Sequence, residues 1–180
     1  MLPQSVKRAV FLDRDGVLNR AVVLDGKPYP PQTLEELFIL PGVVEALENL
    51  KAAGFLLIVV TNQPDVARGK VTKESIEMIN AFLRKSLPID DFRTCFHDDS
   101  DNCNCRKPKP GALIEASIHY GIDLKSSFMV GDRWRDIAAG YAAGCRTIFL
   151  DYDYSEKRPV TPYYCVNTLE QAVPYILGEK

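Results

Sequence analysis

The stretch AVFLDRDGVLN, residues 9–19, joins a run of apolar residues to two aspartates. Residues 9–12 have the continuous apolar character of a strand that is buried on both faces of a parallel sheet. Asp13 and Asp15 follow at the carboxyl end of this strand, where open α/β sheets bind their ligands. Asp15-Gly16 is also a common turn dipeptide, so this fragment alone leaves open a simple tight turn and a carboxylate site.

Further apolar runs alternate with segments of helical period along the rest of the chain. This alternation predicts an α/β fold in which helices cover a mainly parallel sheet. The expected strands are residues 9–12, 55–60, 127–131 and 146–150. The expected helices run from Val43 to a stop at Gly54, from Thr72 to Ser86, from about Pro110 to Gly121, from about Trp134 to Ala143, and onward from Thr168. Pro174 limits the regularity of this last helix. The Pro-rich and polar segments 25–37 and 151–164 are predicted to be long surface loops.

The composition is that of an ordinary globular protein. Of the 180 residues, 46% are hydrophobic and 26% are charged, and the net charge is -2. This charge gives no general attraction to nucleic acid or to an anionic membrane. No stretch has the length of a membrane span or the pattern of a secretory signal, so we expect a cytoplasmic protein. The length of 180 residues fits a single domain over residues 1–180, and we expect a monomer. Cys145 and Cys165 stand in apolar surroundings and are predicted to be buried.

Two other predicted strands also end in polar residues. The motif VVTNQ places Thr61 and Asn62 at the end of one strand, and SFMVGDRWRDI places Asp132, with Asp136 four residues on, at the end of another. Each of these residues alone could be a helix cap. One shared site explains these residues more economically than several separate caps. In that site Asp-x-Asp, Thr, Lys and Asp would lie together at one edge of the sheet.

The motifs DRDGVLN, TNQ, RKP and GDRWRDI, in this order between about Arg8 and Leu150, resemble those of the haloacid dehalogenase-like (HAD) phosphohydrolases. The resemblance implies a three-layer Rossmann-like α/β fold with a mainly parallel central sheet. The expected helices and strands occupy most of the chain from Asp13 to Thr61 and from Thr61 to Lys107. We therefore expect no separate cap domain.

The same resemblance assigns the chemistry. Asp13 would attack phosphorus to form an aspartyl-phosphate, and Asp15 would act as general acid and then as general base. Thr61 and Lys107 would hold the phosphoryl oxygens. Mg²⁺ would be bound by the carboxylates of Asp13 and Asp132 and by the main-chain carbonyl of Asp15. Asp136 would orient either the lysine or a metal-bound water.

The stretch CFHDDSDNCNC contains a second candidate metal site. Cys95, His97, Cys103 and Cys105 form a set of thiolates and imidazole that suits tetrahedral Zn²⁺. Four protein ligands leave no open position for a reacting water. We therefore predict a small structural zinc loop at about residues 95–105.

The zinc motif directly before Arg106-Lys107 narrows the resemblance to the zinc-bearing HAD branch that contains D-glycero-D-manno-heptose 1,7-bisphosphate phosphatases and histidinol-phosphate phosphatases. This branch implies Mg²⁺-dependent removal of the 7-phosphate of the heptose bisphosphate, in the biosynthesis of surface polysaccharide. Histidinol phosphate, or a small sugar phosphate other than the heptose bisphosphate, remains an alternative substrate. A zinc-containing binding module without catalysis is the alternative from a different class. Pro64-Asp65 and Phe96 depart from the branch pattern near the expected substrate entrance.

Several polar residues near these motifs are candidates for contact with the substrate. Arg106 is the leading candidate to bind a second anionic or hydroxyl group, because its planar guanidinium can hold two oxygens at once. The other candidates are Arg68, Arg14, Asn19, Asn62 and Gln63.

Overall fold

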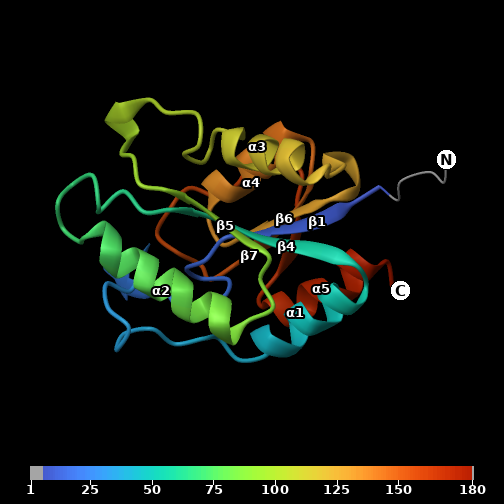
Figure 1. Cartoon of the computed structure of the whole chain (residues 1–180), viewed down its shortest axis with the longest axis horizontal. Coiled ribbons are helices and arrows are strands. Elements are labelled where there is room, and N and C mark those ends of the chain that lie inside the picture. The colour runs from blue at the N-terminus through green and yellow to red at the C-terminus, as the bar shows by residue number, and fades with distance from the viewer. Residues whose placement is uncertain (1–5, 180) are drawn as a thin grey trace.

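The computed structural model describes residues 6–179 and shows a six-stranded sheet between two layers of helices (Figure 1). All neighbouring strands in this sheet are parallel, in the order β5-β4-β1-β6-β7-β8. The strands are β1 (Arg8–Leu12), β4 (Phe55–Asn62), β5 (Asp91–Cys95), β6 (Phe128–Gly131), β7 (Arg146–Leu150) and β8 (Tyr164–Val166). The predicted parallel α/β architecture is confirmed.

The two faces of the sheet carry different helices. α1 (Val43–Ala52), α2 (Lys73–Ser86) and α5 (Leu169–Leu177) cover one face, and α3 (Gly111–Tyr120) and α4 (Trp134–Ala143) cover the other (Figure 1). Strand β1 contributes alternate residues to both cores: Val10 and Leu12 pack toward α1, whereas Ala9 and Phe11 pack toward α3. Because β1 is buried on both faces, its carboxyl end is held firmly at the centre of the sheet edge.

The helix boundaries follow the predicted local signals closely. The hydroxyl of Thr72 accepts a hydrogen bond from the Ser75 amide at the start of α2, and Gly54 adopts a φ of 84° just beyond α1. Pro174 lies inside α5, which nevertheless continues to Leu177 because its apolar face packs against α1. The expected irregularity at Pro174 does not shorten this helix.

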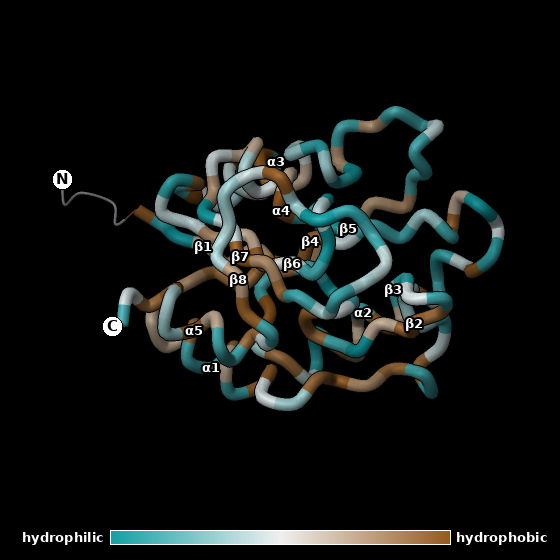
Figure 2. Tube along the Cα trace, turned by 180° about the vertical axis from the view of Figure 1, so that it is seen from behind, coloured by the Kyte–Doolittle hydropathy of each residue, from teal (hydrophilic) through white to brown (hydrophobic). Residues whose placement is uncertain are grey.

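A β-hairpin replaces the start of the first predicted loop. β2 (Val22–Leu24) and β3 (Lys27–Tyr29) pair antiparallel around Asp25 and Gly26, whose φ angles are 51° and 72°. Two positive φ angles in a two-residue Asp-Gly turn are typical of a tight hairpin. Figure 2 shows this hairpin at the side of the molecule opposite the two chain ends. No separate cap domain is formed within residues 6–179.

Two edge strands were also missed. β5 has the polar sequence DFRTC, and β8 falls at the end of the second predicted loop, so neither shows a continuous apolar run. Cys145 is buried as predicted, but Cys165 is exposed because β8 is the outermost strand of the sheet. Among the described residues, no helix is both long and apolar enough to span a bilayer.

Candidate active site

The turn after β1 brings two strand ends into close contact at Gly16. A Cβ atom on this residue would lie 1.9 Å from Oδ2 of Asp132, and its φ of +88° is one that side chains rarely adopt. Glycine at this position therefore allows the loop after β1 to pack directly against the carboxylate that follows β6. The predicted convergence of Asp13 and Asp132 depends on this contact.

Three buried aspartates meet at this point. Carboxylate oxygens of Asp13, Asp132 and Asp136 lie within 4.8 Å of one another. Burial, together with the neighbouring carboxylates, raises the pKa of Asp132 well above its usual range. Burial also raises the pKa of Asp13 to about 6, although the nearby Lys107 opposes the shift.

Both carboxylate oxygens of Asp132 are buried without a hydrogen-bond partner. An unpartnered buried carboxylate beside two others is strongly unfavourable unless a cation neutralises it. Oxygen ligands of this type suit Mg²⁺. Asp13, Asp132 and Asp136 could therefore hold a magnesium ion.

Lys107 compensates part of this negative charge. Its Nζ donates to Oδ1 of Asp13 at 2.8 Å and to the carbonyl of Val60 at 2.6 Å, and it lies 2.6 Å from Oδ1 of Asp136. Burial disfavours the charged ammonium, but the two carboxylates outweigh this effect and raise the pKa of Lys107. Of the two roles expected for Asp136, the structure therefore favours the orientation of the lysine.

Asn62 fixes the backbone of the same lysine. Its Nδ2 donates to the carbonyl of Lys107 at 2.9 Å, and its Oδ1 accepts from the Lys107 amide at 3.1 Å. The end of β4 is thereby joined to the RKP loop. Thr61, one residue earlier, is buried and accepts a hydrogen bond from Nε2 of Gln63 at 2.9 Å.

The carboxylate of Asp15 lies in a different environment. Arg14 donates to both of its oxygens, Asn19 donates to Oδ1 at 2.9 Å, and Gln63 donates to Oδ2 at 2.8 Å. Arg14 and Asn19 are fully buried and Gln63 is 1% exposed. These three residues, which are expected to contact the substrate, are in the lining of neither active-site cavity, and their side chains surround Asp15.

Two adjoining cavities open above these residues. The inner cavity, of about 50 Å³, is lined by Asp13, Asp15, Lys107 and Asp136 among others. The outer cavity, of about 210 Å³, includes the predicted Arg68 and Arg106 in its lining. The residues that line both cavities are Pro28, Tyr29, Pro30, Asn62, Arg133 and Arg135.

The outer cavity is rich in cations. It is lined by five basic side chains and three acidic ones: Lys27, Arg68, Arg106, Arg133 and Arg135, with Asp65, Asp99 and Glu156. Asp99 accepts from Nε of Arg106 at 2.8 Å and from Nη1 of Arg135 at 3.3 Å, so it connects the loop before α3 with α4. Arg68 pairs with Asp98.

Sequence reasoning missed the hairpin residues and two of the arginines in this lining. Arg133 and Arg135 flank Asp132 inside the quoted GDRWRDI motif, and charged residues next to a site aspartate were an available signal. Pro28 and Tyr29 belong to β3, and the Asp25-Gly26 turn was the signal for that hairpin.

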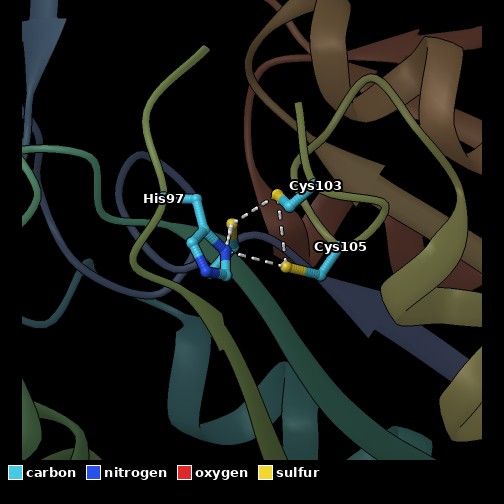
Figure 3. A group of neighbouring side chains, drawn as sticks. His97, Cys103 and Cys105 are labelled. Atoms are coloured by element: carbon cyan, nitrogen blue, oxygen red, sulfur yellow. Dashed lines mark hydrogen bonds between the residues drawn. The ribbon is translucent and has the colours of Figure 1, made fainter. Parts of the chain in front are cut away.

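The four predicted zinc ligands come together at the end of β5. Sγ of Cys103 lies 3.7 Å from Sγ of Cys95 and 3.5 Å from Sγ of Cys105, and Nδ1 of His97 lies 3.6 Å and 3.5 Å from the sulfurs of Cys95 and Cys105. Figure 3 shows His97, Cys103 and Cys105 pointing toward one another. Zn–S bonds of about 2.3 Å and a Zn–N bond of about 2.0 Å in a tetrahedron give ligand separations of about 3.8 Å and 3.5 Å. The cluster therefore fits a tetrahedral Zn²⁺ site.

The sequence and the fold match known proteins. Residues 20–144 match the family of haloacid dehalogenase-like hydrolases. The chain belongs to this hydrolase family. It is 34% identical over 167 residues to the D-glycero-beta-D-manno-heptose-1,7-bisphosphate 7-phosphatase of Helicobacter pylori, an alignment that covers 89% of this chain and 93% of the relative. The relative of the same name from Escherichia coli is 36% identical over 166 residues, covering 86% and 82% of the two chains.

A solved structure shows the same fold. The crystal structure of D,D-heptose 1,7-bisphosphate phosphatase from B. bronchiseptica, in complex with magnesium and phosphate, superposes with a TM-score of 0.83 at 26% identity. The match covers 95% of this chain and 98% of that protein. The HAD fold expected from the sequence motifs is confirmed.

Proposed function

We propose that this hydrolase is a Mg²⁺-dependent phosphatase that removes the 7-phosphate from D-glycero-β-D-manno-heptose 1,7-bisphosphate. One observation carries the proposal: the inner cavity, with Asp13 and Lys107, shares its walls with a cation-rich outer cavity. A substrate with two phosphates matches this pair of cavities, with one phosphate in each. The names of the relatives from Helicobacter pylori and Escherichia coli support the same substrate and its β anomer.

The side chains of the inner cavity support a two-step reaction. Asp13 attacks phosphorus while the ester oxygen leaves, and the proton that this oxygen takes up comes from Asp15. In the second step Asp15 takes a proton from water, which attacks the phosphorus and releases phosphate from Asp13. Lys107 and the Thr61 hydroxyl stabilise the charge on the phosphoryl oxygens.

The metal ions have separate roles in this proposal. Mg²⁺ bound by Asp13, Asp132 and the main-chain carbonyl of Asp15 supplies the positive charge that lets a carboxylate approach a phosphate dianion. Zn²⁺ bound by Cys95, His97, Cys103 and Cys105 has no open position and holds the loop before Arg106 in shape.

We propose that residues 1–180 form one catalytic domain that works as a cytoplasmic monomer. A zinc site with three thiolates suits a reducing compartment.

Histidinol phosphate is a less suitable substrate. Its ammonium group would enter an outer cavity in which five basic side chains outnumber three acidic ones. This charge balance favours a second phosphate over a cationic group.

Phosphate release tests the proposal directly. The α and β anomers of the heptose 1,7-bisphosphate, heptose 7-phosphate and histidinol phosphate are compared in the presence of Mg²⁺ and ranked by kcat/KM. We expect the β bisphosphate to rank first and heptose 7-phosphate to lose efficiency mainly through KM. An equal or higher kcat/KM for histidinol phosphate would refute the proposed substrate.

A further inference from the structure

Arg14 is an arginine without access to solvent, although it lies between the two aspartates of the active site. Its exposed fraction is 0%. Its Nε donates to Oδ1 of Asp15 at 3.1 Å, and its Nη2 donates to Oδ2 of the same carboxylate at 3.0 Å. The guanidinium therefore holds both oxygens of its neighbour in one plane, which is the strongest geometry of this ion pair.

The Asp15 carboxylate is also held by other side chains. Asn19 and Gln63 each donate one further hydrogen bond, one to each oxygen. These contacts hold the carboxylate from both of its oxygens, while Asp15 still lines the inner cavity. The side-chain rotation of Asp15 is consequently fixed by protein groups before any substrate binds.

A second layer of contacts fixes Arg14 itself. Its Nη1 donates to Oδ1 of Asn80 at 3.0 Å, and Nδ2 of Asn80 donates to Oγ1 of Thr94 at 3.1 Å. Asn80 lies on α2 and Thr94 lies on β5. The chain of hydrogen bonds thus runs from Asp15 through Arg14 and α2 to β5 at the edge of the sheet.

We propose that Arg14 is a positioning residue for Asp15, and that Asn80 and Thr94 hold Arg14 in place through a hydrogen-bonded relay. Asn80 and Thr94 line a different cavity from the two at the active site, and the contact that joins Asn80 to the active site is its hydrogen bond to Arg14. The proposal rests on the role in proton transfer proposed above for Asp15.

The physical reason is the demand for accurate placement. A general acid acts on a leaving oxygen only within hydrogen-bond reach, and a displacement of about 1 Å costs about 100-fold in rate. Without Asn80, the Arg14 guanidinium loses its acceptor in the core and gains freedom to turn. Asp15 then loses the planar partner that sets the direction of its carboxylate.

The test uses the full chain with Mg²⁺ and two substrates that differ in the leaving group. The leaving group of the heptose bisphosphate is an alkoxide, which needs a proton. The leaving group of p-nitrophenyl phosphate is a stable phenolate, which does not. The variants are Arg14→Met, Asn80→Leu and the conservative Asn80→Asp, which keeps the acceptor for Arg14. Asn49→Leu, at an exposed position on α1, is the matched control.

We expect Asn80→Leu to lower kcat/KM for the heptose substrate by about tenfold, the factor that corresponds to one hydrogen bond to a charged group. The loss with p-nitrophenyl phosphate should stay below about threefold, because kcat/KM for that substrate does not include proton donation to the leaving group. Asn80→Asp should recover most of the activity. In an Asp15→Ala background, Asn80→Leu should cause no additional loss.

Equal losses on both substrates, or a loss as large in Asn80→Asp as in Asn80→Leu, would overturn the relay. Thermal unfolding of each variant separates these results from misfolding, and Asn80→Leu remains informative if Arg14→Met does not fold. If the wild-type protein prefers another sugar phosphate, the proposed substrate fails and the same comparison is made with that ester.

Discussion

Replacement of Lys107 by Met tests the electrostatic account of the active site. The ammonium is fully buried and contacts Asp13 and Asp136, and the unpartnered Asp132 lies beside them. Removal of one partner from a buried ion pair typically costs about 3–5 kcal/mol, because the remaining charge is left uncompensated. With an m value of about 2 kcal/mol/M, the urea midpoint of the metal-free protein should fall by about 2 M.

The same variant should respond more strongly to magnesium than the wild type. Mg²⁺ replaces part of the lost positive charge, so it should raise the urea midpoint of Lys107→Met by more than that of the wild-type protein. Phosphate release should fall by at least about 100-fold. Lys109→Met, in the same loop but with its ammonium bonded to Asn102 at the surface, is the matched control.

A decrease of less than about 1 kcal/mol in the metal-free unfolding free energy of Lys107→Met would refute this reasoning. It would mean that the three carboxylates do not depend on the lysine. Circular dichroism should show native helix content in both lysine variants, so that the comparison concerns folded proteins.

Three further substitutions test separate parts of the site. Asp13→Asn should abolish phosphate release and leave the thermal unfolding midpoint near or above the wild-type value, and substantial turnover would exclude Asp13 as the nucleophile. Cys103→Ser should lower zinc content, measured by metal analysis, together with the unfolding midpoint; unchanged stability after zinc loss would contradict a structural role. Gly16→Ala should raise the Mg²⁺ concentration needed for half-maximal activity by at least about tenfold, because the new methyl group displaces Asp132. An unaltered Mg²⁺ titration would show that this contact is not needed.

The central fold could be predicted because its strands are long apolar runs followed by polar residues. β1 and β4 are buried on both faces, so burial left a continuous signal in their sequences. β5 and β8 lie at the two edges of the sheet, where fewer neighbours require apolar side chains. The β2–β3 hairpin is short, and its turn signal stood within a Pro-rich segment.

The sequence predicts those parts of the candidate site whose position depends only on where a strand ends. Asp13 and Asp132 directly follow β1 and β6, and Thr61 lies near the end of the neighbouring β4, so the parallel strands bring all three residues to one edge. Side-chain direction could not be predicted in the same way. Arg14 lies between two site aspartates in the sequence, but the polar groups that draw it into the core come from Asn80 on α2.

The pairing of Asp99 with both Arg106 and Arg135 connects the lining of the outer cavity to the loop of the candidate zinc site. Asp99 lies between the zinc ligands His97 and Cys103, in a loop segment that has no buried side chain in its short 3₁₀ turn. In the zinc-bound form proposed above, coordination would restrict this loop in place of a hydrophobic core. On that proposal, loss of zinc would disturb the arrangement of Arg106 and Arg135, so it should change substrate selectivity as well as stability.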